Sequence, residues 1–140
     1  MLLGIKKLHK DAVLPTYADP GASGFDFYAI NSIKIGPKCS GVVITGLAFE
    51  IPKNYEIQAR GRSGLAFNSD VIAHFGTIDE SFKGELKIKL FNLGDKPLII
   101  NVGDRVAQGV FAPVVKADFY ERNELSESQR GESGFGHTGK

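Results

Sequence analysis

Short stretches in which apolar and polar residues alternate recur along most of this chain, and turn signals separate them. The clearest stretches are residues 33–35, 55–60 and 86–91, where a period of two places successive side chains on opposite faces of a strand. Turn signals follow one another at intervals of roughly ten residues, at ADPGASG (18–24), IGPKCSG (35–41), IPKN (51–54) and LGDKP (93–97). This pattern predicts an all-β sandwich or barrel. Only residues 63–69 admit a helical turn or two.

A chain of 140 residues has room for one core and is too short for two ordinary domains. Its formal net charge of +1 gives no electrostatic reason to expect a nucleic acid or a membrane as a partner. Cys39 is the only cysteine, which excludes an intramolecular disulfide and a cysteine zinc site. The beginning of the chain does not have the pattern of a signal peptide, and no segment approaches the roughly 20 apolar residues that cross a bilayer. We therefore expect an intracellular, soluble protein.

The segment GTIDESFKG at 76–84 places a single acid, Asp79, between two apolar runs of strand character. We expect a hairpin formed by residues 71–78 and 85–92, with Asp79 at or beside its turn and Gly84 free to take a positive φ. Turn acids commonly bond only to their own backbone. Taken alone, the segment leaves open whether Asp79 has a structural or a chemical role.

Two further segments carry candidate binding groups. In RGRSGLA at 60–66, a strand runs into the helix-compatible segment, so Arg62 and the backbone N–H groups of Ser63 and Gly64 could bind a phosphate or could simply begin a helix. In GDRVAQGV at 103–110, we expect Asp104 and Arg105 to form a structural pair. Gln108 lies among apolar neighbours, and a buried amide must find hydrogen-bond partners.

Asp26 lies between two phenylalanines in SGFDFYA at 23–29, where it must either bond to neighbouring backbone or face a ligand such as a hydrated cation. The last 25 residues are polar and rich in Gly and Ser, so they cannot fold alone. Their GFGHTGK ending matches phosphate-loop patterns, but no helix can follow it. Its glycines still allow several N–H groups to face one anion, with Arg130 and Lys140 adding positive charge.

Each segment is a weak signal, but their order along residues 18–139 is specific. ADPGASGFDFYA, GRSGLA, GTIDESFKG, GDRVAQGV and RGESGFGHTG together resemble the five ordered motifs of the homotrimeric dUTPase family. The resemblance implies a jelly-roll-like distorted β-barrel over residues 1–115 with one short helix. It also implies a flexible arm, 116–140, that closes over the active site of a neighbouring subunit, and a homotrimer whose sites are shared between chains.

The resemblance further implies the chemistry: hydrolysis of dUTP to dUMP and pyrophosphate with Mg²⁺, which keeps uracil out of DNA and supplies dUMP for thymidylate synthesis. Asp79 matches the catalytic aspartate that activates water, and Asp26 the acid that holds magnesium through its water shell. The residues that match phosphate-binding positions are Arg62, Ser63, Gly64, Gln108, Arg130 and Thr138. Those that match contacts to uracil or deoxyribose are Gly76, Thr77, Ile78, Phe82, Phe135 and Gly136.

The chain departs from the family pattern at three positions. Phe82 stands where tyrosine is usual, Ala73 where many bacterial members carry asparagine, and His137 where serine is commoner. One alternative is a dCTP deaminase of the same fold. It would need a glutamate ten residues beyond Asp79, where this chain has Lys89. A second alternative is a catalytically silent regulatory module of the same fold, against which the retained acids argue.

Overall fold

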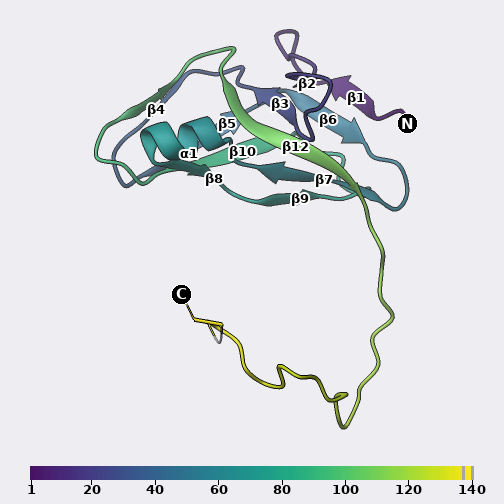
Figure 1. Cartoon of the computed structure of the whole chain (residues 1–140). Coiled ribbons are helices and arrows are strands. Elements are labelled where there is room, and N and C mark those ends of the chain that lie inside the picture. The colour runs from purple at the N-terminus through teal and green to yellow at the C-terminus, as the bar shows by residue number, and fades with distance from the viewer. Residues whose placement is uncertain (137, 140) are drawn as a thin grey trace.

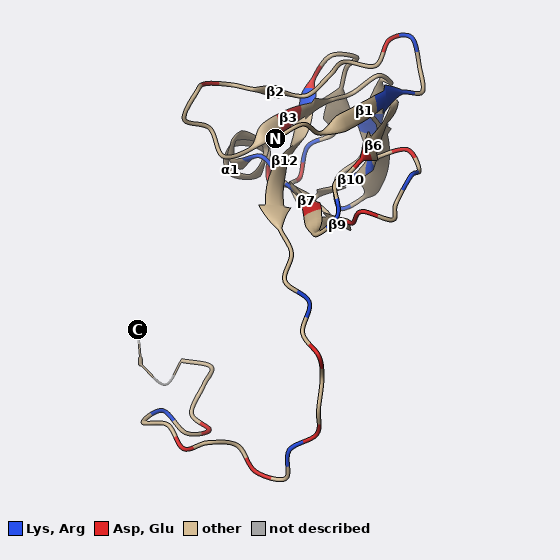
Figure 2. Ribbon diagram, turned by 90° about the vertical axis from the view of Figure 1, so that its right-hand side faces the viewer, with Lys and Arg blue, Asp and Glu red and all other residues tan. Residues whose placement is uncertain are grey.

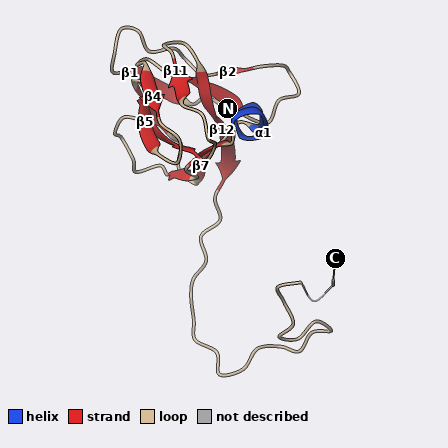
Figure 3. Cartoon of the chain, turned by 90° about the vertical axis from the view of Figure 1, so that its left-hand side faces the viewer, coloured by secondary structure: helices blue, strands red, loops and turns tan. Residues whose placement is uncertain are grey.

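The computed structural model describes residues 1–136 and 138–139. His137 and Lys140, which we expected to contribute to the arm, lie outside the described residues. Figure 3 shows that the described chain consists of strands with a single short helix, which confirms the predicted all-β class. The strands are β1 (Gly4–Lys7), β2 (Thr16–Tyr17), β3 (Phe25–Tyr28), β4 (Ile33–Ile35), β5 (Ser40–Ile44), β6 (Leu47–Glu50), β7 (Tyr55–Arg60), β8 (Val71–Ala73), β9 (Gly76–Ile78), β10 (Lys87–Asn92), β11 (Leu98–Ile100) and β12 (Arg105–Pro113), and the helix is α1 (Ser63–Ser69).

The strands form two larger and two smaller sheets that surround one core (Figure 1). The largest sheet has the order β2-β3-β12-β7-β9, and a second has the order β5-β10-β8. The pairs β1-β6 and β11-β4 complete the body. Neighbouring strands pair antiparallel throughout, and the sheets do not join into one continuous ladder. The fold is a jelly-roll-like, distorted barrel that is open between its sheets.

The alternation in the sequence sets which side chains fill this core. Along β10, Ile88, Leu90 and Asn92 are buried, while Lys87 and Lys89 face solvent. The large buried side chains come from both major sheets, so burial of the two inner faces holds the sheets together. Phe27, Val43, Leu47, Ile57, Leu90 and Val106 are the fully buried examples.

Residues 71–78 differ from the single strand that we expected opposite 85–92. β8 pairs with β10 as predicted, with Ala73 opposite Leu90, but β9 pairs with β7, with Gly76 opposite Ala59. The segment thus leaves one sheet and enters the other at residues 74–75, and the expected hairpin was half right. The alternation of apolar residues was correctly read, but it cannot distinguish between two available neighbouring strands. Gly84 does not take a positive φ; a Cβ there would lie 2.9 Å from the ring of Phe82.

Helix α1 covers Ser63–Ser69, where the sequence allowed a helical turn or two. It follows β7 directly after Gly61 and Arg62, and Arg62 is its N-cap residue in an extended conformation. Asp70 ends the helix in the left-handed region, at φ 53°. The fold therefore places the start of α1 at one end of β7, next to the middle of the largest sheet.

The chain beyond β12 extends away from the body (Figures 1 and 2). Val114, directly after β12, still bonds to the body through its N–H, which donates to the Asn54 carbonyl at 2.8 Å. Farther along, the described hydrogen bonds are local, such as those from Gly131 N–H to the Ser128 carbonyl and from Ser133 N–H to the Arg130 carbonyl. Phe119, Tyr120, Leu125 and Phe135 are all exposed on this segment. Among the described residues, no helix is long and apolar enough to cross a membrane.

Candidate active site

Five of the residues expected around phosphate and metal line one cavity of about 310 Å³. The cavity lies between the turn that precedes β3 and the start of α1. Its floor is the end of β12 that pairs with β3, since Gln108 is opposite Asp26 in the register. The predicted residues in this phosphate cavity are Asp26, Arg62, Ser63, Gly64 and Gln108.

Asp26 is the buried charge of this cavity, with a relative exposure of 7%. Its Oδ1 accepts a hydrogen bond from Arg62 Nε at 3.1 Å, and its Oδ2 faces Arg105 Nη1 at 3.4 Å. Asp26 therefore bonds to two arginine side chains and not to the neighbouring backbone, while its expected role toward a hydrated cation stays a prediction. Two guanidinium groups on one carboxylate leave an excess of one positive charge, which favours an anionic ligand.

Arg105 and Asp104 do not form the pair that we expected. Asp104 Oδ2 accepts a hydrogen bond from the backbone N–H of Asn101 at 2.8 Å, while Arg105 turns to Asp26. The physical reason is that Arg105 begins β12, and neighbouring side chains at a strand end point in different directions. The link between Arg105 and Asp26 spans 79 positions in sequence, so no local pattern could have revealed it.

Gln108 and Gly64 show how the backbone shapes the cavity. Gln108 is half-buried, and its Nε2 donates to the Gly61 carbonyl at 2.9 Å, which gives the amide a partner as expected and leaves its Oε1 toward Gly24. A Cβ added at Gly64 would meet nothing within 4 Å. Packing therefore does not require glycine at this position, whereas close approach of a ligand to its backbone would.

The residues expected around the base and sugar line a second cavity, of about 290 Å³. It opens where β9 separates from β10, with Phe82 and residues 85–89 forming its other wall. β9 is the last strand of its sheet, so one of its edges faces this cavity without a neighbouring strand. The predicted residues in this nucleoside cavity are Gly76, Thr77, Ile78 and Phe82. Lys89 also lines it, at the position where a deaminase would need glutamate.

Asp79 follows β9 and closes a turn at the edge of the nucleoside cavity. Its Oδ1 accepts the Ser81 hydroxyl at 2.6 Å and the backbone N–H groups of Ser81 and Phe82, each at 3.1 Å. The Ser81 hydroxyl does most to lower the pKa of Asp79, followed by the Ser81 N–H. Desolvation opposes them, and the Phe82 N–H and the charge of Lys116 add smaller contributions to the lowering. Asp79 is therefore an exposed, ionised turn acid, and among the described hydrogen bonds its Oδ2 accepts none.

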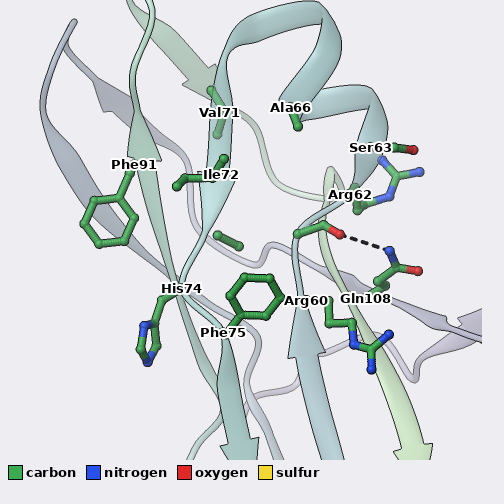
Figure 4. A pocket seen from close by; sticks show the side chains of 12 residues that line it. Arg60, Arg62, Ser63, Ala66, Val71, Ile72, His74, Phe75, Phe91 and Gln108 are labelled. Carbon is green, nitrogen blue, oxygen red and sulfur yellow. Dashed lines mark hydrogen bonds between the residues drawn. The ribbon is translucent and has the colours of Figure 1, made fainter. Parts of the chain in front are cut away.

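A larger cavity of about 620 Å³ lies between these two (Figure 4). Arg62, Ser63 and Gln108 belong to it and to the phosphate cavity, and His74 belongs to it and to the nucleoside cavity. Its lining is otherwise largely apolar, and Phe75 is 76% exposed. Sequence periodicity does not reveal this surface, because Ile72, Phe75 and Phe91 have the pattern of strand residues and their exposure depends on the sheet order.

The strand register gives the spacing between Asp79 and the phosphate cavity. Asp26, Gln108 and Arg60 lie opposite one another across β3, β12 and β7, and Ile57 lies opposite Ile78. Asp79, one residue beyond β9, is therefore about 14 Å across the sheet and about 13 Å along it from Asp26, or about 20 Å in all. Within one chain, Asp79 is therefore well separated from the phosphate cavity.

The expected arm residues lie in neither cavity. Phe135 is fully exposed, and Arg130 Nε bonds locally, to the Ser133 carbonyl at 2.6 Å. Gly136 and Thr138 are also in the extended segment that leaves the body. Among the described residues, no group of three His, Cys, Asp or Glu side chains could hold a metal ion by itself.

The sequence of this chain is similar to those of proteins from one known family. A family model described as dUTPase matches residues 10–139. The chain belongs to the dUTPase family. A relative from Helicobacter pylori (strain Shi470), named deoxyuridine 5'-triphosphate nucleotidohydrolase, is 44% identical over 99% of this chain and 97% of its own. A protein of the same name from Hydrogenobaculum sp. is 47% identical over 99% of both chains.

Solved dUTPase structures share the fold. The dUTPase of Staphylococcus bacteriophage 80alpha, in complex with dUpNHpp, superposes with a TM-score of 0.93 and 26% identity over 99% of both chains. A D95N mutant of the dUTPase from phage phi11 of S. aureus, described with a structural Mg(II) ion, superposes with a TM-score of 0.84 at 21% identity, covering 91% of this chain and 100% of its own.

Proposed function

We propose that this chain hydrolyses dUTP to dUMP and pyrophosphate. The observation that carries the proposal is that residues matched to the dUTPase motifs, far apart in sequence, meet in two cavities: one with phosphate-binding groups and one beside Asp79. The relatives named deoxyuridine 5'-triphosphate nucleotidohydrolase support the same substrate. In the cell this reaction would keep uracil out of DNA and supply dUMP for thymidylate synthesis.

Asp79 would activate the attacking water. Its Oδ1 is engaged by Ser81 and Phe82, which fixes the carboxylate and leaves Oδ2 to accept a hydrogen bond from water. The water oxygen bonds to the α-phosphorus, its proton passes to Oδ2, and the bond from the α-phosphorus to the bridging oxygen breaks with its electron pair on the leaving pyrophosphate. General-base assistance contributes typically about 10² to 10⁴ in rate, so positioning and charge must supply the rest.

The phosphate cavity would supply that charge. Arg62 and the backbone of Ser63 and Gly64 would bind phosphate oxygens, and Gln108 would present its amide to the same chain. Asp26, held by two arginines, fits an outer-sphere role because each oxygen keeps a lone pair for a water of hydrated Mg²⁺. The absence of a three-ligand cluster among the described residues suits an ion that arrives on the triphosphate. Bound Mg²⁺ would neutralise charge on the phosphate oxygens.

The nucleoside cavity would select the base and sugar. The free edge of β9 would offer backbone N–H and C=O groups to the edge of uracil, and the Phe82 ring would lie against deoxyribose and exclude a 2'-hydroxyl. Ala73 is buried, so the side-chain contact that asparagine makes in many bacterial members is missing here. Sugar selection should survive the change from tyrosine to Phe82, because the ring remains.

A complete site would need more than one chain. Asp79 must act within hydrogen-bond reach, directly or through one water, of the reacting group. The phosphate cavity of the same chain is about 20 Å away by the strand register. We therefore propose a homotrimer in which the phosphate cavity of one subunit, the Asp79 turn of a second and the arm of a third form each site. The apolar surface around Phe75 would then be covered by a second copy.

The body would comprise residues 1–115, and the arm, 116–140, would close over the neighbouring site. Phe135 would stack on the base, Gly136 would lie beside it, and Arg130 and Thr138 would contact phosphate. Closure would exclude water from the reacting centre. The arm extends away from the body of its own chain, and its large apolar side chains are exposed. Both observations support binding of the arm to a neighbouring subunit.

The proposal is tested by pyrophosphate release from dUTP, dCTP, dTTP and UTP with Mg²⁺. We expect turnover of dUTP alone, and an Asp79→Asn variant that binds the imido analogue dUpNHpp with little change in Kd while losing turnover. Release of ammonia from dCTP would identify a deaminase, and nucleotide binding without any turnover would identify a silent module. Light scattering at micromolar concentration should give the trimer mass; a monomer would contradict shared sites.

A further inference from the structure

Two segments that serve different parts of the proposed site meet at one backbone residue, Asn54. The Asn54 N–H donates to Glu80 Oε2 at 2.6 Å, and Glu80 is next to Asp79 in the turn. The Asn54 carbonyl accepts the N–H of Val114 at 2.8 Å, and Val114 directly follows β12, where the arm begins. Both backbone groups of Asn54 are therefore used to join the Asp79 turn to the root of the arm.

The order of the strands explains why these segments meet. β7 lies between β9 and β12, and the turn at residues 52–54 leads into it. β9 and β12 both run antiparallel to β7, so the C-terminal ends of both arrive at the start of β7, next to Asn54. Tyr55 stacks on Phe111 with ring centroids 4.9 Å apart, which fixes β12 against the same end of β7.

Asn54 itself has a constrained backbone. Its φ is +64°, in the left-handed region that asparagine tolerates better than most residues other than glycine. The turn is closed by a bond from the Tyr55 N–H to the Pro52 carbonyl at 3.2 Å. This conformation directs the Asn54 N–H toward Glu80 and its carbonyl toward Val114, so one residue bonds to both segments.

We propose that Glu80 is a positioning residue for Asp79, acting through the Asn54 N–H, and that Asn54 holds the catalytic turn and the root of the arm in one arrangement. Without the Glu80 carboxylate, the turn would lose its anchor to the body on this side, and Asp79 would no longer be held at one distance from the reacting phosphorus. A displacement of about 1 Å can lower a rate by about a hundredfold. The inference rests on the proposed function, since it assigns Asp79 as the base.

The role of Lys116 agrees with this arrangement. After the bonds from the Ser81 hydroxyl and N–H, and together with the Phe82 N–H, the charge of Lys116 contributes to the lowered pKa of Asp79. Lys116 is two residues beyond Val114, so the beginning of the arm lies close enough to Asp79 to contribute to its lowered pKa.

The same turn provides a matched control. Lys83 Nζ bonds to Glu50 Oε1 at 2.9 Å, which also joins the Asp79 turn to residues before β7. These side chains are 50% and 76% exposed, and exposed pairs of this kind contribute little. Glu50→Gln therefore removes a carboxylate from the same region without affecting Asn54.

The experiment compares Glu80→Ala, Glu80→Gln and Glu50→Gln in the full-length protein. We expect Glu80→Ala to lower kcat for dUTP about tenfold or more, with KM and the Kd of dUpNHpp within about twofold, because the nucleoside cavity does not include Glu80. Glu80→Gln, which keeps an acceptor oxygen, should recover most of the loss. Glu50→Gln should behave as the wild type.

A second measurement does not depend on turnover. Limited trypsin digestion without nucleotide should cut faster after Lys116 in Glu80→Ala than in the wild type or Glu50→Gln. If the alanine variant fails to fold, Glu80→Met, which preserves side-chain length, replaces it. Unchanged kcat, or equal effects on kcat and thermal stability in all three variants, would overturn the positioning role. If the wild type does not hydrolyse dUTP, the proposed function fails, and unchanged cleavage after Lys116 would then also overturn the link to the arm.

Discussion

Gly64→Ala should make this protein more stable and much less active. Gly64 is the second residue of α1, does not have a positive φ, and has nothing within 4 Å of the position of a Cβ. Alanine therefore fits the folded backbone and reduces the freedom of the unfolded chain, which stabilises by about 0.5–1 kcal/mol. For a domain of this size that corresponds to a rise in Tm of about 2–4 °C. The same methyl group would occupy the space where a phosphate approaches the Gly64 N–H.

The loss of activity follows from displacement of the phosphate chain. A shift of about 1 Å at the reacting centre can cost about a hundredfold in rate. Thermal unfolding and pyrophosphate release, measured on the same preparation, would test both effects. Asn68→Ala is the matched control: Asn68 is an exposed residue of the same helix outside the phosphate cavity, so it should gain stability through helix propensity and retain full turnover. A Gly64→Ala variant with normal turnover, or with a lowered Tm, would refute this account of the glycine.

Three further results are expected. Ser81→Ala removes the hydroxyl that does most to lower the pKa of Asp79, so this pKa should rise. The acid limb of the pH profile of kcat should then move to higher pH, and an unmoved limb would contradict Asp79 as the base. Deletion of residues 129–140 should abolish most turnover in the pyrophosphate assay while changing Tm little, whereas a large fall in Tm would contradict a lid. Gly109→Ala should lower the free energy of unfolding by about 1–3 kcal/mol in urea denaturation, because its Cβ would lie 2.5 Å and 2.7 Å from atoms of two buried phenylalanine rings; wild-type stability would show that the core can adjust.

Local chemistry made much of the fold predictable. The alternation at 55–60 became β7, the helical segment became α1, and the turn signal at 51–54 lies in the turn before β7. Residues matched by the first four ordered motifs also line two cavities, although their roles stay predictions. These features depend on side-chain periodicity and turn geometry, which neighbouring residues determine.

What could not be predicted depends on which strands become neighbours. The two arginines that bond to Asp26 are 36 and 79 positions away in sequence. Residues 76–78 pair with β7 and not with β10, and no local sequence pattern indicates which of the two strands they pair with. The bond between Glu80 and Asn54 likewise exists because β7 lies between β9 and β12. The alternation of apolar and polar residues around a position such as Phe75 is the same whether that side chain is buried or exposed.

The division of residues 71–78 between two sheets has a consequence for engineering base preference. The nucleoside cavity is the opening left where β9 turns away from β10, so its width is a property of the backbone path. Side chains can change at Thr77 or Phe82 while the backbone path around that opening stays the same. Redesign toward a larger base would therefore need a different point of strand separation, by insertion or deletion at residues 74–75, and substitution of the lining alone would leave the aperture as it is.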